Sequence, residues 1–193
     1  MENSDLRIQK TKISLFQAFA CLIQRKKFED ISINELCDEA QVRRATFYNH
    51  YSDKYAFFSD AVKRIFALFT EDLNEGSESM DSIERYKAIV RRLLDFLDSN
   101  QKMLESVLRS RISDLLYTII VGEMEKFIME NLRKDFGDGN MSDTERSILT
   151  QVFTGSLANI CRWWLYNKDK ITKEDLLEYT IGLLKQVLQP RER

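Results

Sequence analysis

The stretch Ser32–Lys54, SINELCDEAQVRRATFYNHYSDK, contains the pattern from which the fold of this chain can be predicted. Its first part spaces apolar side chains by three and four residues, as on one face of a helix: Ile33, Leu36, Cys37 and Ala40. Ser32 precedes this run as a candidate N-cap, and Glu35 three residues on can complete a capping box. The pattern breaks at Gln41 and Val42, so we expect a short helix followed by a tight turn.

A second short helix is expected directly after this turn, through Ala45, Phe47 and Tyr51. Two short helices so close together share one small core, which we expect to contain Leu36, Cys37, Val42, Phe47 and Tyr51. The side chains left outside are all polar: Arg43, Arg44, Thr46, Tyr48, Asn49 and His50. This pattern predicts a helix-turn-helix whose second helix offers hydrogen-bonding groups to a groove of DNA. The alternative is a set of helices that pack together for stability alone.

The run Val42–Tyr51, VRRATFYNHY, followed by Asp53 and Lys54, resembles the DNA-binding module of the tetracycline-repressor (TetR) family of bacterial regulators. The resemblance covers about residues 7–66 well and the remainder only in its general layout. It implies an all-α protein with an N-terminal three-helix DNA-binding domain and a C-terminal helical domain for ligand binding and dimerisation. In this family the second helix of the motif enters the major groove, and the two copies in a dimer read two half-sites.

The resemblance also assigns roles to individual positions. The positions expected to read bases are occupied by Arg44, Ala45 and Thr46. Positions that usually contact phosphates are occupied by Ser32, Tyr48, His50 and Lys54. Arg43 reads a base or holds the backbone, and Asn49 belongs to the same exposed set. Each has a structural alternative: Ser32 as a helix cap only, Tyr48 packed on the first helix, and the arginines as solvated charge.

Two positions depart from the common family pattern. Gln41 stands where glycine commonly makes the turn, and another residue at positive φ costs energy. Arg43 stands where Ser or Thr commonly caps the second helix. A subset of similar proteins looks alike here, so we expect a slightly weakened module and not a lost function.

Composition bounds the class of protein. One proline and six glycines in 193 residues, with 44% hydrophobic residues, favour an all-α fold of about nine helices. No apolar run approaches the roughly 20 residues that a membrane span needs, and no signal-peptide pattern opens the chain. We therefore expect a cytoplasmic protein with no membrane partner.

The net charge of −2 means that DNA binding must depend on local charge. Lys and Arg only slightly outnumber Asp and Glu in residues 1–55. The expected positive edge consists of Arg43, Arg44, His50 and Lys54. Lys10, Lys12 and the run Arg25–Lys27 are further candidates for it, although this run also fits the negative end of the first helix dipole.

The chain is expected to divide into a DNA-binding domain at residues 1–54 and an effector-binding and dimerisation domain at residues 75–193. A connecting helix at about 53–74, capped by Ser52 or Asp53, joins them. Residues 75–79, EGSES, have the composition of a linker. Other helices are expected at about 6–24, 81–98, 101–109, 112–136, 143–166 and 173–188.

The last two of these helices carry more apolar residues than one face can hold. A helix that is apolar on more than one side must be covered on more than one side. The pattern therefore predicts a homodimer through a four-helix interface, which the resemblance also implies. The expected interface residues are Val152, Phe153, Ser156, Ile160, Trp163, Leu176, Tyr179, Leu183 and Val187. The alternative is a central helix inside a monomer.

Cysteine and histidine usage argues against catalysis. Cys21, Cys37 and Cys161 are expected on apolar helical faces as small hydrophobes, with a redox sensor as the alternative. His50 is the only histidine, which excludes a multi-histidine metal site. The sequence has no glycine-rich phosphate loop or nucleophile–base pair, so we expect neither an enzyme nor a cofactor.

These patterns predict a transcriptional repressor that binds a palindromic DNA operator as a homodimer and responds to a small-molecule effector. The resemblance implies an effector pocket in the C-terminal domain. Its candidate lining residues, which also fit a plain core, are Tyr86, Phe96, Met103, Leu108, Tyr117, Ile120, Met124 and Phe127. The alternative function is a co-regulator of the same shape that acts through a protein partner and binds DNA weakly or not at all.

Overall fold

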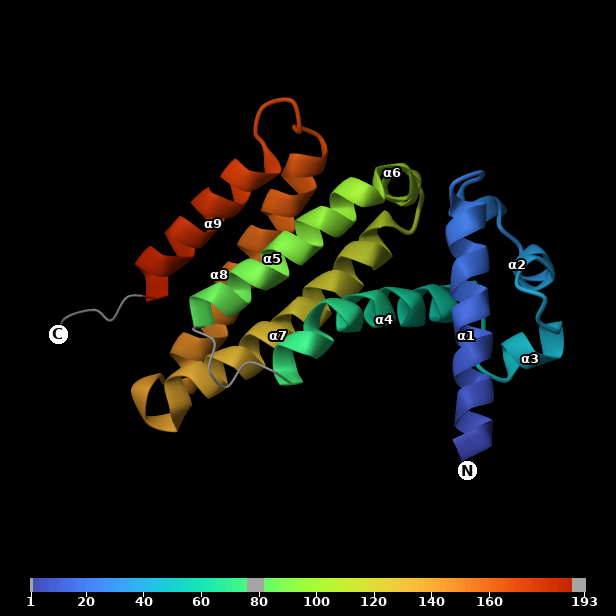
Figure 1. The fold of residues 1–193 in the computed structure, drawn as a ribbon, viewed down its shortest axis with the longest axis horizontal. Coiled ribbons are helices and arrows are strands. Elements are labelled where there is room, and N and C mark those ends of the chain that lie inside the picture. Colours follow the sequence, from blue (N-terminus) through green and yellow to red (C-terminus); the bar gives the residue numbers. More distant parts are fainter. Residues whose placement is uncertain (1, 76–81, 189–193) are drawn as a thin grey trace. The chain divides into compact units, whose positions relative to one another are not determined.

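The computed structural model describes residues 2–75 and 82–188, and in these ranges every regular element is helical (Figure 1). In chain order the elements are α1 Glu2–Ile23, the 3-10 helix η1 Phe28–Asp30, α2 Ile33–Glu39, α3 Arg44–Tyr48, α4 Lys54–Glu75, α5 Ser82–Ser99, α6 Gln101–Leu108, α7 Ser113–Asn140, α8 Asp143–Leu165 and α9 Lys173–Leu188. The prediction of an all-α fold of about nine helices is confirmed for this part of the chain. Apart from Glu75, the predicted linker at 75–79 lies outside the described residues.

The chain divides into two compact units. The first comprises residues 1–64 and 100–119, and the second comprises residues 65–99 and 120–193. The predicted division differs, because it placed 100–119 in the C-terminal domain. This segment belongs with the helix-turn-helix because α6 packs on α1, and because the backbone N–H of Arg111 donates to the Glu29 carboxylate.

The core of the first unit is built from aromatic side chains of α1, η1, α3 and α4. Phe28, Phe47 and Phe57 are each 1% exposed or less. The ring centroid of Phe19 lies 6.1 Å from that of Phe28 and 5.7 Å from that of Phe57, both in edge-on contact. Edge-to-face rings attract one another beyond the effect of buried area. One aromatic cluster therefore holds η1 and α3 against α1 and α4.

The turn between α2 and α3 is closed by backbone hydrogen bonds. The N–H of Val42 donates to the carbonyl of Cys37 at 2.9 Å, and that of Gln41 to the carbonyl of Asp38 at 3.1 Å. Gln41 has φ 54°, in the left-handed region where glycine is favoured. As expected, a residue other than glycine makes this turn, and Arg43 occupies the N-cap of α3 without a side-chain hydrogen bond.

The start of α4 is capped by Asp53, one of the two predicted candidates. Its Oδ1 accepts hydrogen bonds from the N–H groups of Tyr55 and Ala56, both at 2.8 Å. These are two of the N–H groups that lack a partner within a helix, so the cap fixes where α4 begins.

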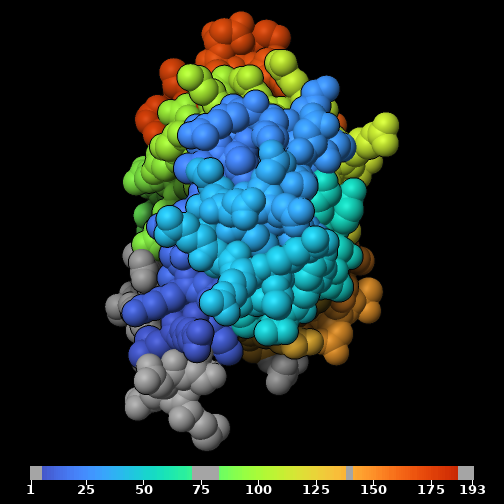
Figure 2. All heavy atoms as spheres, turned by 90° about the vertical axis from the view of Figure 1, so that its right-hand side faces the viewer, coloured from blue at the N-terminus to red at the C-terminus, as the bar shows by residue number. Residues whose placement is uncertain are grey.

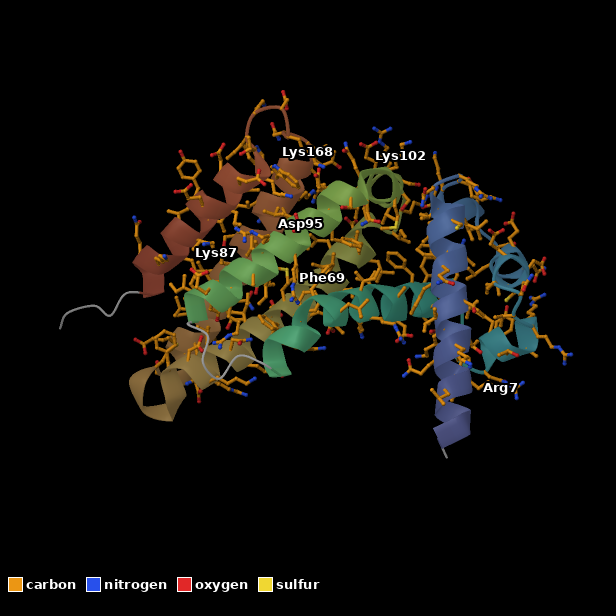
Figure 3. The ribbon with its side chains drawn as sticks, in the orientation of Figure 1. Arg7, Phe69, Lys87, Asp95, Lys102 and Lys168 are labelled. Carbon is orange, nitrogen blue, oxygen red and sulfur yellow. The ribbon has the colours of Figure 1, made fainter. Side chains whose placement is uncertain are left out.

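The second unit contains α5, α8, α9 and the later parts of α4 and α7. Figure 1 shows α8 and α9 running antiparallel, with α5 packed along α9. Lys168 pairs with Asp98 at 2.7 Å, and Lys173 pairs with Asp95; Asp95 and Lys168 are labelled in Figure 3. The core of this unit includes Tyr86, Ile89, Phe127, Ile128, Leu132 and Phe153.

A buried arginine organises the junction between α7 and α8. Gly137 has φ 60° and ψ −178°, a conformation open in practice only to glycine, and it interrupts the end of α7. Arg146, 2% exposed, donates to the carbonyl of Gly137 at 3.0 Å and to Asp143 at 2.7 Å. The guanidinium therefore donates a hydrogen bond at the point where α7 is interrupted.

The cysteines and the helix surfaces limit other functions. Cys37 and Cys161 are buried as predicted, but Cys21 is exposed, which corrects the expectation for that residue. Burial raises the pKa of the Cys161 thiol to about 12 and also raises that of Cys37, so neither readily forms the reactive thiolate. Among the described residues there is no metal-binding cluster, and no helix there is long and apolar enough to cross a membrane.

Candidate functional site

The short helix α3 buries one side chain completely and exposes most of the others. Phe47 is 0% exposed, in contact with the rings of Tyr48, Tyr51 and Phe57. The exposed residues are Arg43, Arg44, Ala45, Tyr48 and Asn49, and the half-buried ones are Thr46 and His50. The residues predicted to face a groove therefore lie together at the surface. Figure 2 views this side of the first unit, with α2 and α3 in light blue and cyan.

Arg44 and Tyr48 are paired across one turn of α3. The Arg44 guanidinium lies 5.5 Å from the ring centroid of Tyr48, and its Nη2 donates to the Tyr48 hydroxyl at 3.4 Å. This hydrogen bond raises the pKa of Arg44, which is charged in any case. Stacking orients the planar guanidinium and leaves most of its five N–H donors available. Such a group can bond the O6 and N7 atoms of guanine.

The ring of Tyr48 contacts Phe47 edge-on, while 44% of the residue remains exposed. This places Tyr48 at the rim of the core rather than within it. Packing alone explains the contact of the Tyr48 ring with Phe47. It does not explain why so much of the residue remains exposed.

Ser32 forms the predicted capping box with Glu35. Its hydroxyl accepts the N–H of Glu35 at 3.2 Å and donates to Oε2 of the same residue at 3.2 Å. The hydrogen bond from Lys26, with that from the Ser32 backbone, lowers the pKa of Glu35 to about 2. The carboxylate therefore supports α2 fully above about pH 4.5 and loses this effect as the pH falls through about 2. Of the two roles weighed for Ser32, the structure shows the cap.

Lys54 has a structural role in place of the expected phosphate contact. Its ammonium donates to three backbone carbonyls, those of Phe28 at 3.0 Å, Glu29 at 2.9 Å and Ile31 at 3.0 Å. An ammonium has three N–H donors, so all of them are engaged. Lys54 therefore joins the start of α4 to η1, and we remove it from the set of phosphate-binding candidates.

Two more of the expected basic residues have internal partners. Lys12 pairs with Asp60 at 2.9 Å, and Lys26 pairs with Glu35. Lys10, Arg25 and Lys27 are exposed. Of the basic residues expected to flank the motif, the exposed ones are therefore Arg43 and Arg44 near the start of α3 and Lys10, Arg25 and Lys27 on and just after α1.

The second unit contains a cavity of about 300 Å³. It is lined by Phe66, Phe69, Tyr86, Ile89, Val90, Leu93, Met124, Phe127, Ile128, Val152, Phe153, Ser156, Leu157, Ile160, Thr180, Leu183 and Leu184. Of the predicted pocket candidates, only Tyr86, Met124 and Phe127 line it. Met103, Leu108 and Tyr117 belong to the first unit. The missed lining residues are nearly all apolar, and no sequence signal separates them from ordinary core.

The predicted dimer face is partly exposed and partly buried. Val152, Trp163, Tyr179 and Leu183 are 47–69% exposed, Ser156 is exposed and Ile160 is half-buried. The prediction is wrong for Phe153 and Leu176, which are only 9% and 6% exposed and belong to the interior of this unit. Phe153 lies in the cluster around Phe127. Ile148, 58% exposed, was missed. The side chain of Val187 lies outside the described residues.

A family model and a curated relative both match this chain. The family model TetR_C_8, described as "Transcriptional regulator C-terminal region", matches residues 84–186. A curated relative, the HTH-type dhaKLM operon transcriptional activator DhaS of Lactococcus lactis subsp. lactis (strain IL1403), is 25% identical over 154 residues, which are 79% of this chain and 78% of that protein.

Solved structures share the fold. A TetR transcriptional regulator from Streptococcus agalactiae 2603V aligns with a TM-score of 0.63 at 24% identity, covering 95% of this chain and 98% of that one. Thermus thermophilus FadR, described as a TetR-family transcriptional repressor in complex with lauroyl-CoA, aligns with a TM-score of 0.67 at 18% identity, covering 94% and 97%.

Proposed function

Because the chain belongs to the TetR family of transcriptional regulators, we propose that it binds a two-fold-symmetric DNA site as a homodimer, with α3 of each copy in a major groove. The observation that carries this proposal is the division of α3 into one buried anchor, Phe47, and a surface of hydrogen-bonding side chains. A helix that only completed a core would not need this set of polar groups.

Within this surface we assign two kinds of contact. Arg44, Ala45 and Thr46 read base edges, and Arg43 reads a base or holds the backbone. Tyr48, Asn49 and His50 contact the phosphate backbone and fix the register of α3. Ser32 and Lys54 support the module from within, through the capping box and the three carbonyl bonds described above.

The exposed apolar face of α8 and α9 supports dimerisation. On α8 the residues Ile148, Val152 and Trp163 follow one another at intervals that keep them on one side of the helix, and Tyr179 and Leu183 do so on α9. An exposed apolar surface of this kind marks an interaction site. We propose that it is covered by the same face of a second copy, which makes the contact self-complementary and closed.

We propose repression through occupation of the operator, since DNA binding alone is sufficient for it. Activation needs in addition a contact with the transcription machinery. The L. lactis relative is named an activator and the T. thermophilus protein a repressor, so the family name is compatible with either sign. The cavity of the second unit is the proposed effector site. An effector acts by binding better to one of two dimer states, and equal affinity for both would change nothing.

Selection of bound fragments from a random DNA pool with the purified chain tests this function. We expect an inverted repeat, bound with an affinity that falls steeply with salt as phosphate contacts release counterions. A chain that shows no salt-dependent affinity for any selected fragment would contradict the proposal and favour the co-regulator.

Dimerisation is tested by Leu183→Arg, which places charge in the centre of the exposed face. Glu178→Arg, also exposed on α9, is the matched control. Sedimentation velocity should show a dimer for the parent and the control and a monomer for Leu183→Arg. A parent chain that sediments as a monomer would refute the dimer.

A further inference from the structure

We propose that the cavity of the second unit binds a neutral, largely hydrocarbon small molecule and rejects anionic ligands such as free fatty acids and acyl-CoA. That this molecule acts as an effector rests on the proposed function; that the cavity binds it does not. All residues that line the cavity belong to the second unit, which comprises residues 65–99 and 120–193.

The wall of the cavity is apolar on every helix that contributes to it. Phe66 and Phe69 come from α4, with Phe69 labelled in Figure 3, and α5, α7, α8 and α9 supply further apolar side chains. Among the described residues that line the cavity, none is Lys, Arg, Asp, Glu or His. The favourable contribution to the binding free energy of a ligand is therefore the removal of its hydrocarbon surface from water, about 25 cal/mol per Å².

The few hydroxyl groups of the wall are already engaged or held neutral. Ser156 Oγ donates to the carbonyl of Phe153 at 3.1 Å, and Thr180 Oγ1 donates to the carbonyl of Leu176 at 2.7 Å. The Tyr86 hydroxyl is buried without a hydrogen-bond partner among the described residues, and burial, with a smaller contribution from Asp135, raises its pKa, so it is an uncharged phenol. None of the three offers a cation to an anionic ligand.

A charged ligand group inside this wall would lose its hydration without gaining an opposite charge. Transfer of an unpaired ion into such an environment costs many kcal/mol, and the ion is excluded or neutralised instead. Among the cations that adjoin the wall in sequence, Arg85 is paired with Asp135, and Arg92 donates to the carbonyl of Phe69 at 3.3 Å; neither arginine lines the cavity. The wall therefore selects against carboxylates as well as for hydrocarbon.

Among the described residues, the face of α8 and α9 on which the cavity opens offers no cation beside it. Of the lining residues, Val152, Ser156 and Leu183 are exposed, so in the single chain the cavity opens on the face of α8 and α9, which the same face of a second copy covers in the proposed dimer. Their exposed neighbours on this face are Ile148, Asn159, Tyr179 and Gln186, which are uncharged. An acyl-CoA could not place its phosphates at this mouth beside a positive charge.

The volume limits the size of the ligand. A cavity of about 300 Å³ is at the lower end of the range of about 300–1,000 Å³ for ligand pockets. It accommodates a single medium-length alkyl chain or a small ring system, but not a nucleotide-sized group in addition.

Displacement of the neutral fluorophore N-phenylnaphthylamine from the purified chain tests this ligand class. Decanol and decanoate have the same chain length and differ in charge at about pH 8, where a carboxylic acid is ionised. We expect decanol to displace the fluorophore saturably and decanoate to bind at least about tenfold more weakly, a difference of about 1.4 kcal/mol. Equal affinity of the two ligands, or tighter binding of decanoate, would overturn the proposal.

The location is tested by Ser156→Trp, which introduces a large ring at the exposed rim of the cavity. Because this rim lies on the proposed dimer face, sedimentation velocity is measured for this variant and for its control. Asn159→Trp is the matched control, because Asn159 is exposed on the same face of α8 and does not line the cavity. We expect Ser156→Trp to weaken decanol binding about tenfold or more and Asn159→Trp to bind as the parent does. Parent-like binding by Ser156→Trp would place the ligand elsewhere.

The ligand-binding measurements are made without DNA, so their outcome does not depend on the proposed DNA-binding function. If decanol binds in the cavity and leaves the affinity for the selected operator unchanged, the ligand class is supported and the effector role is refuted. If the chain binds its operator but decanol does not bind, the ligand class is refuted and the DNA-binding function stands.

Discussion

The α3 helix of the first unit and the α8 helix of the second expose opposite kinds of surface. On α3 the apolar side chain of Phe47 is buried and the polar ones are exposed, with Tyr48 44% exposed at the boundary. On α8 apolar residues occur on both sides: Phe153 is buried, while its neighbour Val152 is 51% exposed. In α3 the core and the binding surface differ in chemistry. In α8 they consist of the same residue types.

This difference determines what a substitution reports. On α3, a change at the buried Phe47 alters the fold, and a change at an exposed polar side chain alters the proposed contact with DNA. On α8, Val152 both lines the cavity and lies on the proposed dimer face, so one change affects both properties. In the first unit, substitutions should therefore affect either the fold or DNA binding.

The largest effect is expected for Phe47→Ala. Loss of a fully buried ring should reduce the free energy of unfolding of the first unit by about 3–5 kcal/mol and abolish DNA binding. Leu132→Ala, a fully buried residue of the second unit, is the matched control and should cost about 2–5 kcal/mol there. Urea unfolding followed by circular dichroism measures both. A stable, DNA-binding Phe47→Ala chain would show that α3 is not anchored by this ring.

Lys54→Met should have the next largest effect. It leaves three backbone carbonyls without their charged donor, and we expect a loss of about 2–3 kcal/mol in the free energy of unfolding. Lys27→Met, at an exposed lysine, should change stability by about 0.5 kcal/mol or less. The salt dependence of DNA affinity distinguishes the two roles of Lys54. If Lys54→Met is as stable as the parent and only flattens this dependence, Lys54 is a phosphate contact after all.

The smallest effect is expected for Gln41→Gly. At φ 54° glycine avoids a steric cost of roughly 1–2 kcal/mol but loses more chain entropy on folding, so the net gain should be up to about 1 kcal/mol. Thermal unfolding detects such a shift. A loss of stability would mean that the Gln41 side chain makes a contribution larger than the backbone cost.

Much of the fold could be predicted because its signals are local. The helix at 173–188 was placed at its observed bounds, and the break after residue 136 coincides with Gly137 at φ 60°. The polar set on α3 was identifiable because Arg44 and Phe47 differ so strongly in chemistry. Local patterns of this kind need no knowledge of the tertiary structure.

The wrong predictions concern residues whose burial or hydrogen-bond partners depend on contacts between segments far apart in the sequence. Lys54 donates to carbonyls 23 to 26 residues earlier in the chain, and no spacing rule reveals that arrangement. Phe153 and Val152 are adjacent apolar residues, and only the packing of α8 on its neighbours determines which of them is buried. For the same reason the cavity-lining residues could not be separated from the remaining core.

The most direct test of the central claim measures Arg44→Ala and the parent chain on the selected operator and on its single-base-pair variants. The account predicts that Arg44→Ala loses about 1–3 kcal/mol of discrimination at one base pair in each half-site and retains discrimination elsewhere. Identical base preference in the two proteins, at every position, would contradict the claim that α3 reads DNA through Arg44.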